Sequence, residues 1–101
     1  MNIKLLDYNP HGAFDGDTFE FEVGGEIVHV ERWRNDSSSG MEFYNKSTGK
    51  FLYEVKDRDK VEAIQIMVGK VDAIWGDVFM THLEPIYARE RAALLEKVNS
   101  A

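Results

Sequence analysis

Residues 14–34, FDGDTFEFEVGGEIVHVERWR, decide the fold class of this chain. Apolar and polar residues alternate on both sides of Gly24-Gly25, which is the period of strands with one buried face. Two adjacent glycines accept the positive φ angles of a tight hairpin turn, and a two-residue turn fixes the register of its strands. We therefore predict an antiparallel hairpin with Val23 opposite Glu26, Phe21 opposite Val28, Phe19 opposite Val30, Glu20 opposite His29, and Thr18 opposite Glu31.

A second hairpin is predicted in residues 41–57, MEFYNKSTGKFLYEVKD. Two aromatic-rich runs flank a polar turn in which Gly49 suits a left-handed backbone position. Pairing Asn45 with Lys50 places Tyr44 opposite Phe51, and aromatic cross-strand pairs of this kind stabilise a sheet. Residues 2–8 can add a further strand, which we expect to end at the Asn9-Pro10 turn signal.

After Lys56 the apolar residues change to a helical period. Asp59 and Glu62 have the spacing of a capping box, and Gly76 is a suitable helix stop. The inner face of this helix is predicted to hold Val61, Ile64, Met67, Val68, Val71, Ile74 and Trp75. A second helix is predicted over residues 85–98, with Tyr87, Leu94, Leu95 and Val98 facing inward and Arg91 at the edge of that stripe. The fold class is α+β: an antiparallel sheet of two hairpins in residues 17–56, with the N-terminal strand added, then two helices on one sheet face, in a single domain spanning residues 1–101.

The composition limits the function classes that suit the chain. The 101 residues include no cysteine, which excludes disulfides, zinc–thiolate sites and cysteine nucleophiles. No long apolar run predicts a membrane span, and the first ten residues have no secretory signal. The formal charge of −6 disfavours direct binding to nucleic acid or to an anionic membrane. We expect a cytoplasmic protein.

The acidic residues are unevenly distributed. Residues 5–31 contain seven acids and no lysine or arginine, and most of these acids fall on or beside the first hairpin. A surface of one charge sign attracts a partner of the opposite sign, and tryptophan and arginine are favoured at interfaces. We therefore predict a non-enzymatic inhibitor or adaptor that binds a basic protein surface, for example that of a nucleic-acid-binding protein. It would use no cofactor, metal or catalytic residue, and its predicted partner-binding residues are Asp15, Asp17, Glu20, Glu22, Glu26, Glu31, Trp33 and Arg34.

Two alternatives stay open. Asp15-Gly16-Asp17-Thr18, with the hairpin after it, resembles the start of the thermonuclease (staphylococcal-nuclease-like) family. That resemblance implies a metal-dependent phosphodiesterase in which Asp17 is a calcium ligand and Arg32 stabilises the phosphate. It covers only this part of the chain: where the family continues with Ile-Asp-x-Pro-Glu, this sequence has WRNDSSSG. In the other alternative, the broad apolar face of the helix after residue 60 is part of a homodimer or a larger homo-oligomer that assembles through the C-terminal helices.

Overall fold

A computed structural model describes residues 2–13, 16–34, 37–52, 58–75 and 88–100. Four strands form one antiparallel sheet in the order of the chain. They are β1 (Ile3–Ala13), β2 (Gly16–Val23), β3 (Glu26–Arg34) and β4 (Ser39–Asn45). Two helices follow, α1 (Arg58–Trp75) and α3 (Ala88–Ser100). The predicted α+β fold, with an antiparallel sheet followed by two helices, is confirmed.

The first hairpin has the predicted register at every position. Val23 pairs with Glu26, and the ladder continues through Phe19 opposite Val30 to Gly16 opposite Trp33. Gly24 and Gly25 have φ angles of 56° and 85°, so both occupy the left-handed region that a type I′ turn requires. Local turn chemistry and the alternation of apolar residues therefore specify this hairpin together.

The second hairpin forms its predicted contacts over a short length. Tyr44 pairs with Phe51 as an isolated bridge, and Gly49 has a φ of 72°. The Asn45 N–H donates to the Lys50 carbonyl at 2.8 Å, and the Leu52 N–H donates to the Phe43 carbonyl at 2.9 Å. The rest of the predicted return strand, residues 53–56, lies outside the described residues.

The N-terminal strand is longer than the sequence predicted. The expectation that Asn9-Pro10 ends it is wrong, because β1 continues through Pro10 to Ala13. Proline removes a backbone donor, which an edge strand tolerates on its open side, and β1 is the edge strand beside β2. The register of β1 against β2 also shifts twice, between Leu5 and Asp7 and between Asn9 and Ala13.

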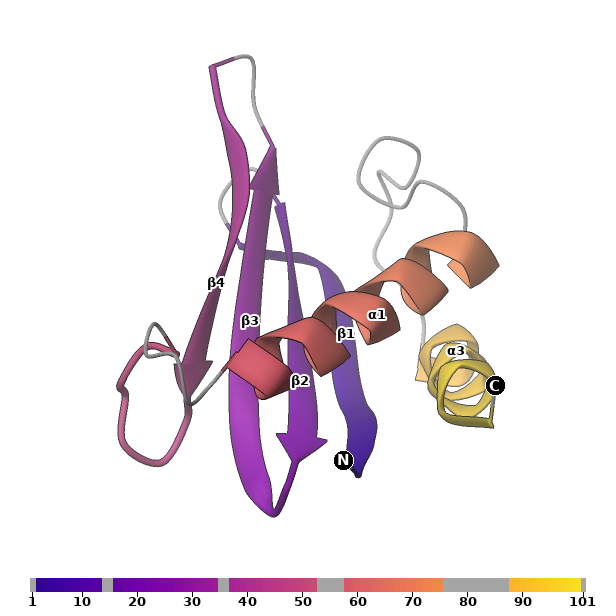
Figure 1. Cartoon of the computed structure of the whole chain (residues 1–101). Coiled ribbons are helices and arrows are strands. Elements are labelled where there is room, and N and C mark those ends of the chain that lie inside the picture. The colour runs from indigo at the N-terminus through magenta and orange to yellow at the C-terminus, as the bar shows by residue number, and fades with distance from the viewer. Residues whose placement is uncertain (1, 14–15, 35–36, 53–57, 76–87, 101) are drawn as a thin grey trace.

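Both helices lie near one face of the sheet, which we call the inner face (Figure 1). Helix α1 crosses this face, and α3 lies beside α1 and β1.

The helix predictions are only partly met. Helix α1 begins at Arg58, so Asp59 lies in its first turn instead of capping it. The prediction that Ile74 faces inward is wrong, because its side chain is 38% exposed. Pro85 and Tyr87, predicted for the second helix, lie outside the described residues, as does the Trp75 side chain. The core between the sheet and the helices contains Leu5, Tyr8, Phe19, Phe21, Val23, Val28, Val30, Phe43, Leu52, Ile64, Met67, Val68, Val71, Leu94 and Val98.

Candidate functional site

The opposite side of the sheet, which we call the outer face, carries most of the predicted partner-binding residues. Alternation along each strand puts side chains of alternate residues on this side, and neither described helix lies over it (Figure 1). None of these side chains is as deeply buried as the inner row of Phe19, Phe21, Val28 and Val30. The outer face consists of Lys4, Asp7 and Asn9 from β1, Thr18, Glu20 and Glu22 from β2, Ile27, His29, Glu31 and Trp33 from β3, and Gly40, Glu42 and Tyr44 from β4.

The outer face is acidic even after its internal ion pairs are counted. It carries Asp7, Glu20, Glu22, Glu31 and Glu42 against Lys4, and Lys46 reaches it from the turn after β4. Lys46 Nζ donates to Glu20 Oε1 at 2.7 Å, and this hydrogen bond lowers the pKa of the Glu20 carboxyl and raises that of the Lys46 ammonium. His29 lies between two acids, with Nδ1 3.6 Å from Glu20 Oε1 and Nε2 3.6 Å from Glu31 Oε1.

Two pairs of acids are directly opposed on the outer face. Asp7 lies opposite Glu20 in the β1–β2 ladder, and Glu31 lies opposite Glu42 in the β3–β4 ladder. Like charges in this position destabilise a sheet, so the Glu31–Glu42 pair is a local cost to the fold. A cation from a binding partner would reverse the sign of this contribution.

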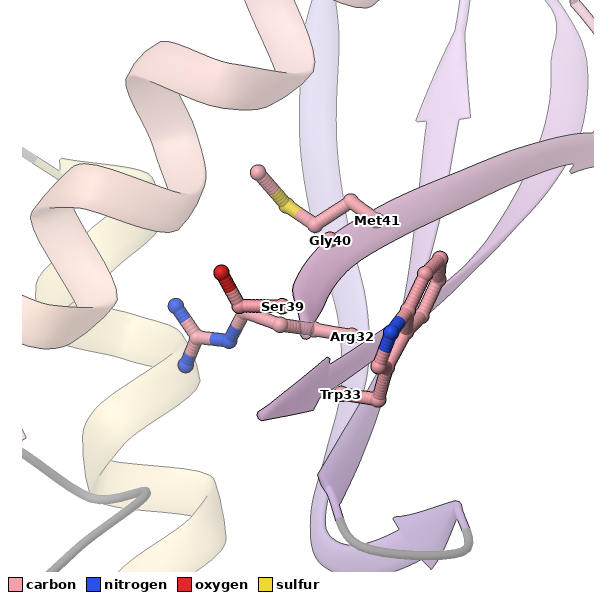
Figure 2. A pocket seen from close by; sticks show the side chains of 5 residues that line it. All are labelled: Arg32, Trp33, Ser39, Gly40 and Met41. Carbon is pink, nitrogen blue, oxygen red and sulfur yellow. The ribbon is translucent and has the colours of Figure 1, made fainter. Parts of the chain in front are cut away.

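Trp33 lies at the end of the outer face, between two glycines. It pairs with Gly16 in β2 and with Gly40 in β4. A Cβ atom on Gly40 would lie 2.8 Å from Trp33 Cζ2, so the glycine makes room for the indole ring. A pocket of about 240 Å³ opens here, lined by Arg32, Trp33, Ser39, Gly40 and Met41. Figure 2 shows Arg32 and Met41 extending toward α1, while the indole lies on the other side of the strands.

Asp17 is not part of the exposed acidic surface. Its residue surface is 1% exposed, and its carboxylate accepts hydrogen bonds from Arg32 Nε at 2.9 Å, Arg32 Nη2 at 2.7 Å and the Tyr8 hydroxyl at 2.7 Å. The Arg32 guanidinium also donates to Asp72 of α1 at 2.9 and 3.0 Å and lies 5.2 Å from the centre of the Phe19 ring. The placement of Asp17 among the partner-binding residues is therefore corrected: it anchors a buried ionic network that joins β1, β2, β3 and α1.

The network keeps the Tyr8 hydroxyl protonated. Burial, and then the nearby Asp17 carboxylate, raise the pKa of the Tyr8 phenol well above its ordinary value. Burial alone would lower the pKa of Arg32, but its hydrogen bonds to Asp17 and Asp72 raise it overall. The guanidinium is therefore charged and the phenol neutral at physiological pH, and each group can donate to carboxylate.

Glu26 also departs from the prediction. It pairs with Val23, so its side chain lies on the inner face, where Glu26 Oε2 accepts hydrogen bonds from Lys60 Nζ of α1 at 2.7 Å and from Asn45 Nδ2 at 2.9 Å. The Lys60 hydrogen bond lowers the pKa of the Glu26 carboxyl. Glu20, Glu22, Glu31 and Trp33 are on the outer face as expected, whereas Asp15 and the Arg34 side chain lie outside what the structure describes.

The sequence analysis missed two members of the outer face, Asp7 and Glu42. Asp7 lies opposite Glu20, and its carboxylate is 3.6 Å from Arg91 Nε of α3. Glu42 was missed because the sequence between residues 34 and 39 does not fix the register of β4 against β3. The acid at position 42 becomes informative only when it is placed opposite Glu31.

The structure offers little support for the nuclease-like arrangement. Both Asp17 oxygens already accept hydrogen bonds, and Arg32 is held by two carboxylates, so binding a cation or a phosphate here would break existing contacts. Within the described part of the chain, no three histidine or acidic side chains are grouped so that they could hold a metal ion.

No described helix is long and apolar enough to cross a bilayer. No family model, curated protein or solved structure matches this chain.

Proposed function

We propose that this chain is a non-enzymatic protein-binding domain, an inhibitor or adaptor, whose outer sheet face binds a basic protein surface. The observation that carries the proposal is a sheet face over which neither described helix lies and which has five acids, four of them in directly opposed pairs: Asp7 with Glu20, and Glu31 with Glu42. An opposed pair of like charges is a local cost to the isolated chain that a cationic partner would remove.

The aromatic groups on this face support the same assignment. Trp33 lies at one end beside a pocket, and the Tyr44 ring centre lies 5.0 Å from that of His29 and 5.9 Å from that of Phe51. Large aromatic side chains among charged ones are typical of interface anchors surrounded by a polar rim. A surface rich in lysine and arginine, such as that of a nucleic-acid-binding protein, suits these groups through ion pairs and cation–π contacts. The absence of cysteine is in keeping with a reducing compartment, so the proposal places the domain in the cytoplasm.

The test compares two double charge reversals of equal net charge. Glu22→Lys with Glu31→Lys alters the outer face, whereas Glu62→Lys with Glu96→Lys alters exposed positions on α1 and α3. Each protein is immobilised and used to capture partners from a cell lysate at low and at moderate salt. A basic protein retained by the wild type and the helix variant, but lost with the outer-face variant and with rising salt, is the expected result.

Equal retention by the two double variants would rule out the outer face as the binding surface. A thermal unfolding curve for each variant confirms that the comparison is made between folded proteins. Any captured partner is then purified, and its affinity for the wild type is measured directly over a range of salt concentrations.

A homo-oligomer formed through the helices is the second candidate. Ile66 of α1 is 65% exposed, although most apolar residues of that helix are buried. An Ile66→Lys variant whose mass in solution equals that of the wild type at high concentration would count against this assembly.

A further inference from the structure

The backbone groups of the two edge strands, β1 and β4, differ in their hydrogen-bond partners. On the β1 edge, the Asn99 side chain of α3 pairs with the backbone of Leu5: Asn99 Oδ1 accepts from the Leu5 N–H at 2.8 Å, and Asn99 Nδ2 donates to the Leu5 carbonyl at 2.9 Å. A side-chain amide here takes the place of a neighbouring strand. Pro10 and the two register shifts in β1 are further features that prevent one sheet edge from pairing with another chain.

Strand β4 forms the other edge of the sheet, and alternate residues of β4 direct their backbone groups away from β3. Asn45 and Phe43 direct backbone groups away from β3, because the Asn45 N–H donates to Lys50 and the Phe43 carbonyl accepts from Leu52. Antiparallel strands alternate the direction of these groups residue by residue, so Met41 and Ser39 also direct their N–H and C=O groups away from β3. Among the described residues, none pairs with these outward groups of Ser39 and Met41.

Strand β4 lacks several of the features that protect a sheet edge. Its sequence, SGMEFYN, contains no proline and no lysine, and its register against β3 has no shift. Among the described residues, 50–52 pair with β4 only at residues 43–45. Ser39 is exposed, and Gly40 and Met41 are half-buried, so this end of the strand is accessible to solvent. Within the described part of the chain, the sheet therefore has one protected edge and one edge that can accept another strand at residues 39–41.

We propose that an extended segment of the basic partner adds to β4 as a fifth strand and pairs with the backbone of Ser39 and Met41. This inference rests on the proposed function and names the form in which the partner binds. Strand addition of this type takes its affinity from main-chain hydrogen bonds and its specificity from alternate side chains.

The residues around β4 indicate which side chains the added partner segment should carry. Positions on the outer side of the added strand would lie next to Glu42, with Glu31 and Trp33 one strand further in, so lysine or arginine suits them. Positions on the inner side would lie next to Met41 and the pocket it lines, so an apolar residue suits them. The expected segment alternates apolar and basic residues.

A second copy of this chain suits the same edge less well. Antiparallel pairing of two β4 strands would join two acidic outer faces into one surface and bring the Glu42 side chains of the two copies close together. The repulsion between them opposes that assembly, whereas a basic segment is attracted. Charge complementarity therefore favours the basic segment.

The test uses a synthetic peptide in which valine and lysine alternate. Hydrogen exchange at the Met41 amide is followed by NMR with and without peptide, and affinity is measured by titration. The peptide is expected to slow exchange at Met41 and to lose affinity as salt rises. An otherwise identical peptide with glutamate in place of lysine should not bind.

Two changes remove the backbone pairing. Met41→Pro deletes an N–H that β3 does not use, with Met41→Leu as its control, and is expected to weaken peptide binding by about tenfold. N-methylation of the peptide valines, which face Met41 in the expected register, should weaken binding equally without any change to the protein. The second test still decides the question if Met41→Pro fails to fold.

The outcomes separate this inference from the proposed function. Salt-dependent binding that is lost with Glu22→Lys and Glu31→Lys but is unaffected by N-methylation, with no protection of Met41, would overturn strand addition and leave face binding standing. No binding of the alternating peptide by the wild type would overturn the inference, while the capture experiment tests the outer face independently. Met41 protection that depends on protein concentration without peptide would identify a second copy as the occupant and would also overturn it.

Discussion

Arg32 holds Asp17 and Asp72 at the same time, joining the middle of the sheet to α1 through one guanidinium. The two carboxylates have different surroundings: the Asp17 side chain is 1% exposed and that of Asp72 is 41% exposed. Replacing one partner of a buried ion pair leaves the other charge uncompensated, whereas an exposed pair contributes little. The Asp17–Arg32 pair should therefore contribute more to the free energy of unfolding than the Asp72–Arg32 pair.

Chemical denaturation of three variants tests that asymmetry. Asp17→Asn is expected to lower the free energy of unfolding by about 3 kcal/mol, and Tyr8→Phe by about 1–3 kcal/mol through loss of a hydrogen bond to a charged group. Asp72→Asn should cost less than about 1 kcal/mol. If Asp72→Asn destabilised the fold as much as Asp17→Asn, the contact between the sheet and α1 would be the dominant part of the network.

Stability at alkaline pH provides a second test of the network. The pKa of Tyr8 in the fold is raised above its ordinary value of 10.0, so the unfolded chain loses this proton first. The contribution of Tyr8 is fully present below about pH 10 and is lost as pH rises above that value. Unfolding free energy measured from about pH 8 to pH 11 should therefore fall less steeply for Tyr8→Phe than for the wild type.

Tyr44→Phe is the control for this experiment. The pKa of Tyr44 is also raised, by burial first and then by Glu31 and Glu20, but its ring lies on the half-exposed outer face. Removing its phenol should change the alkaline slope less than removing that of Tyr8. Identical slopes for the wild type and Tyr8→Phe would contradict the role of the buried phenol.

How much of this arrangement the sequence predicts depends on the range of the interactions. The first hairpin is specified by neighbouring residues and a two-residue turn, so its register was predictable residue by residue. The same register, continued one step beyond Thr18 and Glu31, places Asp17 opposite Arg32 on the face of Phe19 and Val30. The burial of Asp17 could therefore have been predicted from the sequence. It was not predicted because every acid was assigned to the surface.

Other features depend on contacts between distant segments. Asp72 is separated from Arg32 by 40 positions, and no periodic pattern indicates that the two meet. The same holds for Asn99 and Leu5, which are 94 positions apart. The extension of β1 past Pro10 depends on its place at the sheet edge, which becomes known only once the strand order is known.

Replacing Glu42 with glutamine should raise the stability of the fold and weaken partner binding. Glu42→Gln removes the repulsion with Glu31 and is expected to stabilise the fold by about 0.2–1 kcal/mol in chemical denaturation. The same change removes an acid from the outer face and should weaken binding of a basic partner. Glu62→Gln on α1 is a matched control that should leave binding unchanged. A Glu42→Gln protein that is less stable than the wild type would show that the opposed pair is not repulsive in its setting.

The Asn99 side chain offers a test of edge protection that involves no partner. Asn99→Ala removes both hydrogen bonds to Leu5 and leaves the backbone groups of that residue open, so unfolding free energy should fall by about 1–3 kcal/mol. Asn99→Asp keeps the acceptor for the Leu5 N–H, loses the donor to the Leu5 carbonyl and should have an intermediate stability. If Asn99 also prevents edge pairing, the Ala variant should form larger species as concentration rises, as measured by light scattering, whereas the wild type should not. An Asn99→Ala protein that loses stability but keeps the wild-type mass at every concentration would show that Pro10 and the register shifts protect this edge without Asn99.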